Sequence, residues 1–541
     1  MRKILSFILL FSLAQSTFAQ FYNGLQQEFG KNRVQYDDKF WLYLRYDNYD
    51  VYHDKAGKKL AEFVAQNVDS NYAEIKRILE FEYSRRIVFV VYNTMDDFRQ
   101  SNIGYSTSDD EYNVGGTTQI IDNKVVLYFN GDHNDLVRQI RKGIAEVMMS
   151  EFLFGVGAYR KILSNTDLAA YPDWFFDGMT EYFSNSWNAQ KEELFSQRVK
   201  VGAYKKLSDL YGDDAIFIGQ ALWVYIGQKY GDKTVANILY MSKLTDDIDA
   251  SFQYLLGKDL RMVLLEMTSY YQQKDSSPEN PIVSNVDIPK RLTKRAITDV
   301  SLNSDASKIV FVTNKKGKTG IWVYDFGTQK TTNIFRYGSM VEQITDYSYP
   351  IVRWHPSLNA LAFFYEKKGR LWFSIYNLET KEMMTREFFH FEQVLDFSYA
   401  PDGTKIVFSG VQGGQTDVFT YNIQTYENEQ ITNDKADERF PLYVQNGSKI
   451  LFSSNRADDD LQNYQTQLQP TYDLFLLAGK SLERLETSSA SELRPLELRK
   501  GEYAYMSDRN GLTNLFSVSR DSTVSYVDTA MHYSYTTKNF A

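Results

Sequence analysis

A repeat in the second half of the chain is the feature that most restricts the fold. Five similar segments each close on an aromatic residue, at Phe311, Phe363, Phe408, Phe452 and Tyr505, so that the spacing is 44 to 53 residues. Each segment precedes a second short apolar run, such as GIWVYD after the first. A period of about 45 residues with several short strands is typical of β-propeller blades, which bury their faces against neighbouring blades. The repeat predicts an all-β propeller over residues 291–541 with five to six blades. It does not show whether the ring of blades is closed.

Residues 20–271 have a different rhythm, in which helix and strand patterns are mixed. Apolar residues recur at helical spacing over 56–83, and IVFVVY at 87–92 is a continuous apolar run, as in a buried strand. Two short strands are expected within 117–129. Residues 272–290 contain three prolines and no periodicity, which predicts a linker. The expected fold class is therefore multidomain, an α+β domain followed by an all-β propeller.

The first 19 residues predict export. Arg2 and Lys3 precede an apolar run, and Ala19 is a small residue at the expected cleavage site of a signal peptide. A membrane anchor is the alternative, but the run is shorter than the roughly 20 apolar residues that span a bilayer. The chain has no Cys, which excludes disulfides, thiolate metal sites and a lipid-modified N-terminal Cys. We expect an exported protein that is periplasmic or associated with the outer membrane through a partner.

The formal net charge of -9 argues against a nucleic-acid role, which needs a basic footprint. No segment after the first 19 residues is apolar enough to span a bilayer, so no transmembrane segment is expected after signal cleavage.

One motif in the first half carries a family resemblance. Residues 172–182 follow the pattern P-x-W-x-x-[E/D]-G-x-x-E-Y, formed by Pro172, Trp174, Asp177, Gly178, Glu181 and Tyr182. Together with the preceding helix, buried strand and hairpin, this motif resembles the gluzincin zinc peptidases in their peptidase MA-like branch. The resemblance implies that the acid at position 177 is the third zinc ligand. It also implies that His-Glu-x-x-His on the preceding helix supplies two ligands and the general base.

The best alignment puts His-Glu-x-x-His on residues 142–146, where Lys142, Gly143 and Glu146 replace the His, Glu and His. The chain has five His residues, none of them between 134 and 354, whereas a catalytic zinc needs three protein ligands. We therefore expect a pseudo-peptidase with no catalytic residues, metal or cofactor. Lys142 and Glu146 are one helical turn apart, so they form either an ion cluster with Asp177 in place of the metal or a solvated surface pair.

Three further features of this half leave alternatives open. Asp173, Asp177 and Glu181 form an acidic row; glycosidases use paired carboxylates, although such rows are more often solvated helix faces. At a helix start, Asp132 or Asn134 is expected to be the cap, and His133 is expected to be a surface residue or a neighbour of the cap rather than a ligand. The strand at 117–129 is an edge to which a peptide could add as a further strand.

The amino-acid sequences of the repeats carry a second resemblance. YAPDGTKIVFSG and QITNDKADERFP resemble TolB-type propeller repeats, which are WD40-like and are also called PD40 repeats. The whole chain resembles large secreted TolB-like proteins of Bacteroidota. We hypothesise a non-catalytic scaffold of the cell envelope that binds protein partners. The partners we expect are envelope proteins or secretion machinery. The alternative is a hydrolase, peptidase or glycosidase, with an unorthodox acidic site.

Overall fold

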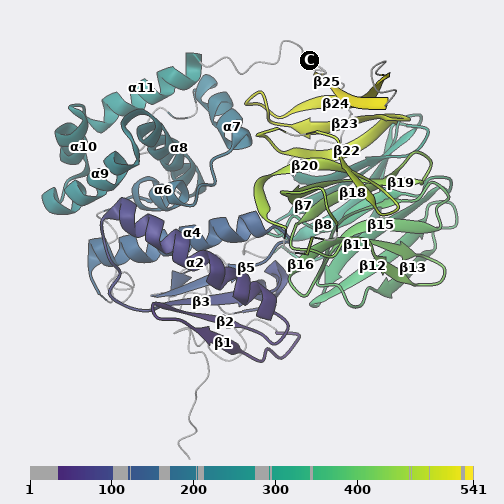
Figure 1. Ribbon diagram of the computed structural model, residues 1–541, viewed down its shortest axis with the longest axis horizontal. Helices are drawn as coiled ribbons and strands as arrows, with labels where there is room; N and C mark the ends of the chain where they lie inside the picture. The colour runs from purple at the N-terminus through teal and green to yellow at the C-terminus, as the bar shows by residue number, and fades with distance from the viewer. Residues whose placement is uncertain are drawn as a thin grey trace, which may run out of the picture.

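The computed structural model describes residues 35–101, 120–121, 123–156, 171–202, 204, 212–273, 292, 295–340, 345–461, 463–464, 466–486, 488–524 and 531–539. The expected signal peptide at 1–19 and most of the expected linker at 272–290 lie outside the described residues. An α/β region and a stack of small sheets lie side by side (Figure 1). No helix in the described part of the chain is both long and apolar enough to cross a membrane.

A five-stranded sheet of order β1-β2-β3-β5-β4 forms one layer of the N-terminal region. Its strands are β1 (Leu42–Arg45), β2 (Tyr49–His53), β3 (Ile87–Tyr92), β4 (Ile120–Ile121) and β5 (Lys124–Tyr128). The apolar run of β3 lies at the centre and pairs in parallel with β2 and β5, while β1 and β4 are antiparallel edges. The prediction of a buried strand at 87–92 is confirmed, and the two strands expected within 117–129 are β4 and β5.

Helices cover the sheet and form a separate lobe. They are α2 (Lys58–Leu79), α3 (Met95–Arg99), α4 (His133–Phe154), α6 (Asp173–Phe183), α7 (Ala189–Lys200), α8 (Asp213–Tyr230), α9 (Asp232–Thr245), α10 (Ile248–Leu256) and α11 (Leu260–Gln273). Leu60, Val64, Val68 and Ile75 recur at helical spacing along α2 and are buried, because this stripe faces the core shared with α4 and the sheet. The α6 to α11 lobe lies on the far side of α4 from the sheet (Figure 1).

The C-terminal region consists of five antiparallel sheets of four strands, each formed by consecutive strands. The first blade consists of β6 (Ala296–Leu302), β7 (Lys308–Lys315), β8 (Lys318–Asp325) and β9 (Lys330–Tyr337). The second consists of β10 (Ile351–Trp354), β11 (Ala360–Lys367), β12 (Arg370–Asn377) and β13 (Met383–Glu387). The third consists of β14 (Gln393–Tyr399), β15 (Lys405–Gln412), β16 (Gln415–Asn422) and β17 (Asn428–Gln430). The fourth blade consists of β18 (Glu438–Val444), β19 (Lys449–Arg456), β20 (Leu468–Ala478) and β21 (Ser481–Arg484). The fifth consists of β22 (Glu492–Arg499), β23 (Glu502–Ser507), β24 (Asn514–Val524) and β25 (Met531–Asn539). The predicted propeller is confirmed with five blades.

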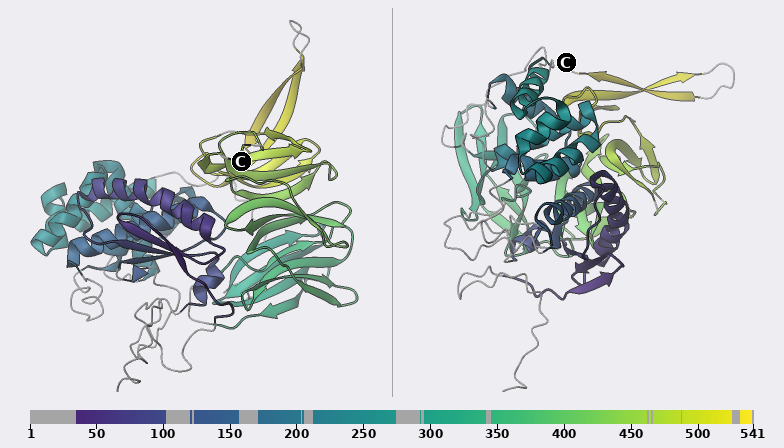
Figure 2. Two further views of the ribbon diagram at one scale, coloured as in Figure 1. Left: turned by 60° about the horizontal axis from the view of Figure 1, so that its bottom comes forward. Right: turned by 90° about the vertical axis from the view of Figure 1, so that its left-hand side faces the viewer.

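The tail is the outer strand of the fifth blade and does not start the sixth blade that the sequence allowed. Residues 531–539 are β25, which pairs with β24 from Phe516 to Val524 and completes the fifth blade. β23 pairs with β24 only as far as Ser519, so the end of the β24–β25 hairpin extends past the rest of its sheet. Figure 2 shows this hairpin projecting beyond the other blades.

Side chains that alternate along a strand pack against the two neighbouring blades. On β11, Phe363 belongs to the apolar cluster shared with the first blade, and its neighbour Phe364 belongs to the cluster shared with the third. The inner strands of the terminal blades also carry exposed apolar residues: Val300 is 51% and Leu302 is 54% exposed in the first blade, and Leu498 is 45% exposed in the fifth. Of the described apolar clusters, none joins the fifth blade to the first.

A buried group of charges lies between the third and fourth blades. Arg456 is fully buried, and its Nη2 donates to Asp434 Oδ2 and Glu438 Oε1, both at 2.7 Å. Thr432 bridges Glu438 to Asp417 of β16. Burial raises the pKa of Glu438 well above its ordinary value, against the opposing charge of Arg456. The fifth blade repeats the arrangement less deeply, with Arg509 donating to Glu492 at 2.9 Å.

The first turn of α4 rests on the propeller. The backbone N–H of His133 donates to Asp437 Oδ2 at 2.8 Å, and the His133 Nδ1 lies 2.6 Å from Asp437 Oδ1. Of the two expected cap residues, Asp132 is the N-cap, because its side chain accepts from the N–H groups of the first turn. Of the two placements expected for His133, the neighbour of the cap is confirmed, whereas a surface position is not: His133 is 4% exposed, because Asp437, Phe63 and Phe129 cover it. Burial opposes protonation of His133, but Asp437 raises its pKa above the ordinary value.

Replacing Asp437 by alanine is expected to loosen the contact between the two regions. The change leaves the His133 N–H and the Asn455 amide, which also donates to Asp437, without an acceptor, at a cost of about 1–3 kcal/mol. The measurement is hydrogen exchange of residues 131–136, which should speed up in Asp437→Ala. Asp305→Ala, at an exposed turn of the first blade, is the control; equal protection in both variants would contradict the expectation.

Candidate functional site

Helices α4 and α6 bring together four charged residues. Lys142 and Glu146 lie one turn apart on α4, and Asp177 and Glu181 lie one turn apart on α6. Lys142 Nζ donates to Glu181 Oε1 at 2.5 Å, and its side chain is 29% exposed. Glu181 Oε2 also accepts from Ser186 at 3.1 Å and lies 3.9 Å from Lys191 Nζ. The direct partner of Lys142 is thus Glu181, a residue that the sequence analysis placed in the motif and not in the ion cluster.

The charges of all four residues act on one another. Burial raises the pKa of Glu146 to about 7, with Lys142 opposing and Asp177 adding to the rise. Burial and then Asp173 raise the pKa of Asp177 to about 6. Burial opposes ionisation of Glu181 as well, but Lys142 holds its pKa below the ordinary value. Near neutral pH the group therefore holds an ionised Lys142–Glu181 pair beside two carboxyl groups that still exchange protons.

Helix α6 carries a second, structural face. Pro172 is its N-cap residue, and Trp174 is 6% exposed, with its carbonyl accepting from the Trp223 indole at 3.3 Å. A Cβ added to Gly178 would lie 2.7 Å from the Cα of Gly219, so only glycine permits this approach of α6 to α8. Tyr182 donates to Asp232 Oδ1 at 2.5 Å. Trp174, Gly178 and Tyr182 thus fix α6 on the lobe, which leaves Asp177 and Glu181 facing α4.

Gly143 does not face the charged residues. A Cβ at this position would lie 2.2 Å from Val125 Cγ1, on β5. The glycine therefore allows α4 to lie directly on the sheet. A longer side chain at residue 143, such as the glutamate of the peptidase motif, would collide with the strand.

The residues at positions 142, 146 and 177 do not fit a catalytic zinc. An ammonium group has three donors and no lone pair while it is charged, so Lys142 in its ion pair cannot be a metal ligand. Within the described ranges, no group of three or more His, Asp or Glu side chains is arranged to hold a metal ion.

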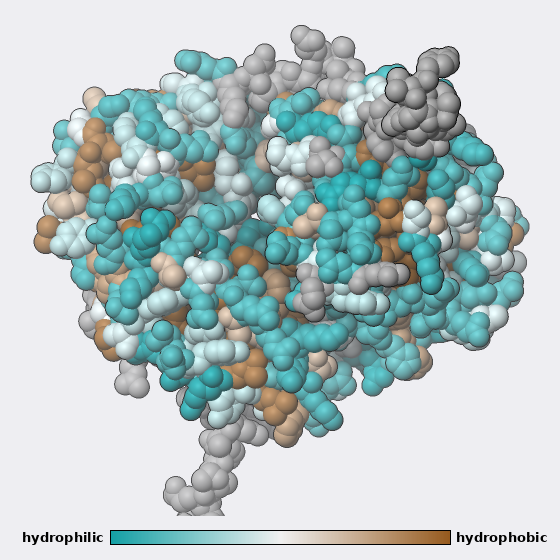
Figure 3. Space-filling model, in the orientation of Figure 1, coloured by the Kyte–Doolittle hydropathy of each residue, from teal (hydrophilic) through white to brown (hydrophobic). Residues whose placement is uncertain are grey.

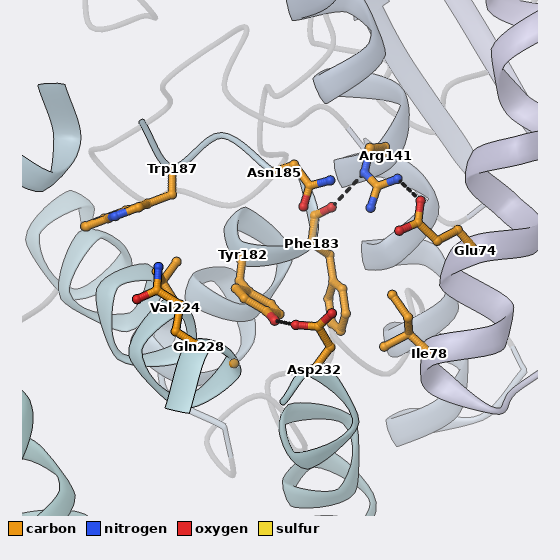
Figure 4. A pocket seen from close by; sticks show the side chains of 11 residues that line it. Glu74, Ile78, Arg141, Tyr182, Phe183, Asn185, Trp187, Val224, Gln228 and Asp232 are labelled. Atoms are coloured by element: carbon orange, nitrogen blue, oxygen red, sulfur yellow. Dashed lines mark hydrogen bonds and ion pairs between the residues drawn. The ribbon is translucent and has the colours of Figure 1, made fainter. Parts of the chain in front are cut away.

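A separate cavity of about 320 Å³ is lined by residues of α2, α4, α6, α8 and α9 and by none of the four charged residues (Figure 4). Arg141, next in sequence to Lys142, forms one wall and is 7% exposed. Its guanidinium donates to Glu74 at 2.5 Å, Asn71 at 2.9 Å and the Phe183 carbonyl at 3.2 Å, so it ties α2, α4 and the end of α6 together. Arg141, Lys191 and Ser186 could not be identified from the sequence, because it does not show which distant side chains they contact.

No protein-family model matches the chain. It is similar to the Tol-Pal system protein TolB of Francisella tularensis subsp. holarctica (strain OSU18), with 24% identity over 221 residues that cover 38% of this chain and 48% of that protein. The same protein of Francisella tularensis subsp. mediasiatica (strain FSC147) gives the same identity and coverage. The chain spans about half the length of the curated relatives it matches.

Among solved structures, TolB from Acinetobacter baumannii has 15% identity and a TM-score of 0.34, covering 42% of this chain and 52% of its own. A putative TolB from Agrobacterium tumefaciens has 12% identity and a TM-score of 0.33, covering 44% of this chain and 80% of its own. The five sheets of the C-terminal region form a β-propeller in this structure, and part of the chain is similar in sequence to part of TolB.

Proposed function

We propose that this chain is a non-catalytic scaffold of the cell envelope, in which a pseudo-peptidase region and a propeller bind protein partners. One observation carries the proposal: the Lys142 ammonium pairs with Glu181 between α4 and α6, where the family resemblance would put a metal. Similarity to proteins named for the Tol-Pal system supports an envelope role and a periplasmic or outer-membrane location. On the face seen in Figure 3, hydrophilic residues predominate and apolar residues form small separate groups, which suits partners that bind through polar contacts.

The purified protein is expected to contain far less than one zinc per chain and to leave fluorogenic peptides uncleaved. Metal content by mass spectrometry and turnover of a mixed peptide library check both points. Asp177→Ala is the informative variant and Asp305→Ala the matched surface control. Stoichiometric zinc, together with turnover that Asp177→Ala abolishes, would overturn the proposal. If zinc and turnover are both absent, chemical crosslinking in envelope extracts identifies the partners.

The second candidate is a metal-free hydrolase, which one observation favours. Glu146, with a pKa of about 7, lies beside Glu181, whose pKa is held low by Lys142. Two carboxyl groups with separated pKa values are the pattern of a general acid and its partner base. Turnover of a glycoside or peptide without metal, lost in both Glu146→Gln and Glu181→Gln, would establish this function in place of the scaffold.

A further inference from the structure

The fifth blade is joined to the rest of the propeller through one described apolar interface. Its buried side chains Tyr505 and Phe516 belong to a cluster that also contains Leu451 and Leu474 of the fourth blade. The fourth blade also packs against the third, through Phe452 in a separate cluster. The fifth blade lies at the end of the stack (Figure 2), so a change at its junction with the fourth blade acts on the fifth blade first.

A pair of buried carboxyl groups crosses this junction. Asp473 on β20 is 1% exposed, and Glu492 on β22 is 0% exposed. Arg484 Nη1 donates to Asp473 Oδ2 at 2.6 Å, and Arg509 Nη2 donates to Glu492 Oε1 at 2.9 Å. Ser488 also donates to Glu492 Oε1, at 2.5 Å. One oxygen of each carboxyl group is thus bound by an arginine of its own blade.

The other oxygen of each carboxyl group faces its partner in the pair. Asp473 Oδ1 and Glu492 Oε2 are both buried, and neither has an N–H or hydroxyl donor among the described groups. The hydrogen bond that remains for them joins the two carboxyl groups to each other. Because an ionised carboxylate can only accept, this bond requires that one of the two is protonated. The pair therefore holds one proton at the place where the two blades meet.

The charges around the pair favour this proton. Arg484 also binds Asp459 at 2.7 Å, and Arg509 also binds Glu486 at 3.3 Å. Two guanidinium groups therefore face four carboxyl groups, so that one proton lowers the excess of negative charge from two to one. Other charged or titratable side chains of the neighbouring elements have partners of their own: Tyr505 with Arg509, Asp508 with the Ser491 N–H, Arg494 with the Phe440 ring, Glu483 with Arg520, and Arg456 with Asp434 and Glu438.

The pKa values of the pair agree with a shared proton and indicate which residue carries it. Burial raises the pKa of Glu492 to about 8, with Asp473 adding to the rise and Ser488 and Arg509 opposing it. Burial raises the pKa of Asp473 as well, against the charge of Arg484 and the hydrogen bond from Glu492. Glu492 is thus the donor of the bond between the two groups, and Asp473 is the acceptor.

We propose that Asp473 and Glu492 form a proton latch: the proton that they share holds the fifth blade on the fourth, and its loss at alkaline pH loosens the fifth blade. Once both groups are ionised, two buried carboxylates face each other without a donor and repel each other. The blades can relieve this repulsion by separating, which admits water to the pair and exposes the apolar interface beside it. The latch would thus make the surface that the propeller offers to partners depend on pH. This inference goes beyond the proposed function and does not depend on whether α4 and α6 are catalytic.

The test is hydrogen exchange of the full chain from pH 6 to pH 9, with each rate divided by that of an unstructured peptide at the same pH. Because the pKa of Glu492 is raised in the closed junction, the closed state binds more protons than the open state up to about pH 8. Protection of β22 and β23 should therefore fall at least about tenfold between pH 6 and pH 8 and then level off. Protection of β7 and β8 in the first blade, the internal reference, should not follow this fall. Glu492→Gln, which keeps a donor toward Asp473 but cannot ionise, should abolish the fall.

Two further variants separate the proton from packing. Glu486→Gln changes the other carboxylate that Arg509 binds and leaves the pair intact, so the fall should persist in this matched control. Asp473→Asn removes the charge that faces Glu492, so the fall should move to lower pH, which also tests the latch if Glu492→Gln does not fold. Infrared absorption at pH 6 observes the proton itself, since Glu492→Gln should remove the absorbance of one protonated carboxyl group. An equal fall in Glu492→Gln, an equal fall in β7 and β8, no shift in Asp473→Asn, or unchanged carboxyl absorbance in Glu492→Gln would each overturn the proposal.

Discussion

Replacing Arg456 by alanine is expected to lower the free energy of unfolding of the propeller by about 3–5 kcal/mol. The guanidinium lies between Asp434 and Glu438, and the side chains of all three residues are fully buried. Alanine would leave two carboxyl groups without their counter-charge in a site closed to water. The loss exceeds that of an ordinary large-to-small change, because a cavity and an unpaired charge arise together.

Urea unfolding followed by tryptophan fluorescence measures this effect. Arg499→Ala is the matched control, because Arg499 is 80% exposed and its ion pair with Glu502 should contribute no more than about 1 kcal/mol. Combining Arg456→Met with Asp434→Asn and Glu438→Gln should recover much of the loss, since no unpaired charge remains. A loss in Arg456→Ala no larger than in Arg499→Ala would show that the charges are not desolvated as described.

Replacing Lys142 by methionine is expected to cost about 2–3 kcal/mol at pH 8, between the values for exposed and fully buried pairs. Methionine keeps most of the aliphatic stem but removes the cation beside Glu181, Glu146 and Asp177. The change should also raise the pKa of all three carboxyl groups. Lys59→Met, on the exposed face of α2, is the matched control and should cost less than about 0.5 kcal/mol.

The cost of Lys142→Met should depend on pH in a defined direction. Glu146 and Asp177 have pKa values of about 7 and about 6 in the folded chain, above their ordinary values. The folded state therefore binds more protons than the unfolded state between about pH 4 and 7, and their contribution to stability falls as the pH rises through that window. The loss in Lys142→Met should be smaller at pH 5 than at pH 8. A loss independent of pH would contradict a charge origin and indicate packing alone.

Much of the fold could be predicted because its signals are local or repeated. The aromatic residues from Phe311 to Tyr505 mark the five blades at constant positions, since each blade solves the same packing problem. The run at 87–92 required a buried strand whatever its neighbours. The tail at 531–539 was harder to assign, because a single strand pattern does not say whether it completes one sheet or begins another.

The site was predictable only along each helix. Sequence spacing puts Lys142 next to Glu146 and Asp177 next to Glu181, but the choice of partner across helices depends on how α4 and α6 are rotated. That rotation follows from contacts with no sequence signal of their own, such as Gly143 against Val125 and Gly178 against Gly219. For the same reason, the motif did not distinguish the face of α6 that packs from the face that carries charge.

The contact between His133 and Asp437 joins residues 304 positions apart. It therefore forms only when both the N-terminal region and the fourth blade are folded. Until then the first turn of α4 has only its local cap at Asp132, so the helix that carries Lys142 and Glu146 starts with its end exposed. The cover over the first turn of α4 is thus completed by a residue of the propeller, so the two regions share one buried polar contact that neither can form alone.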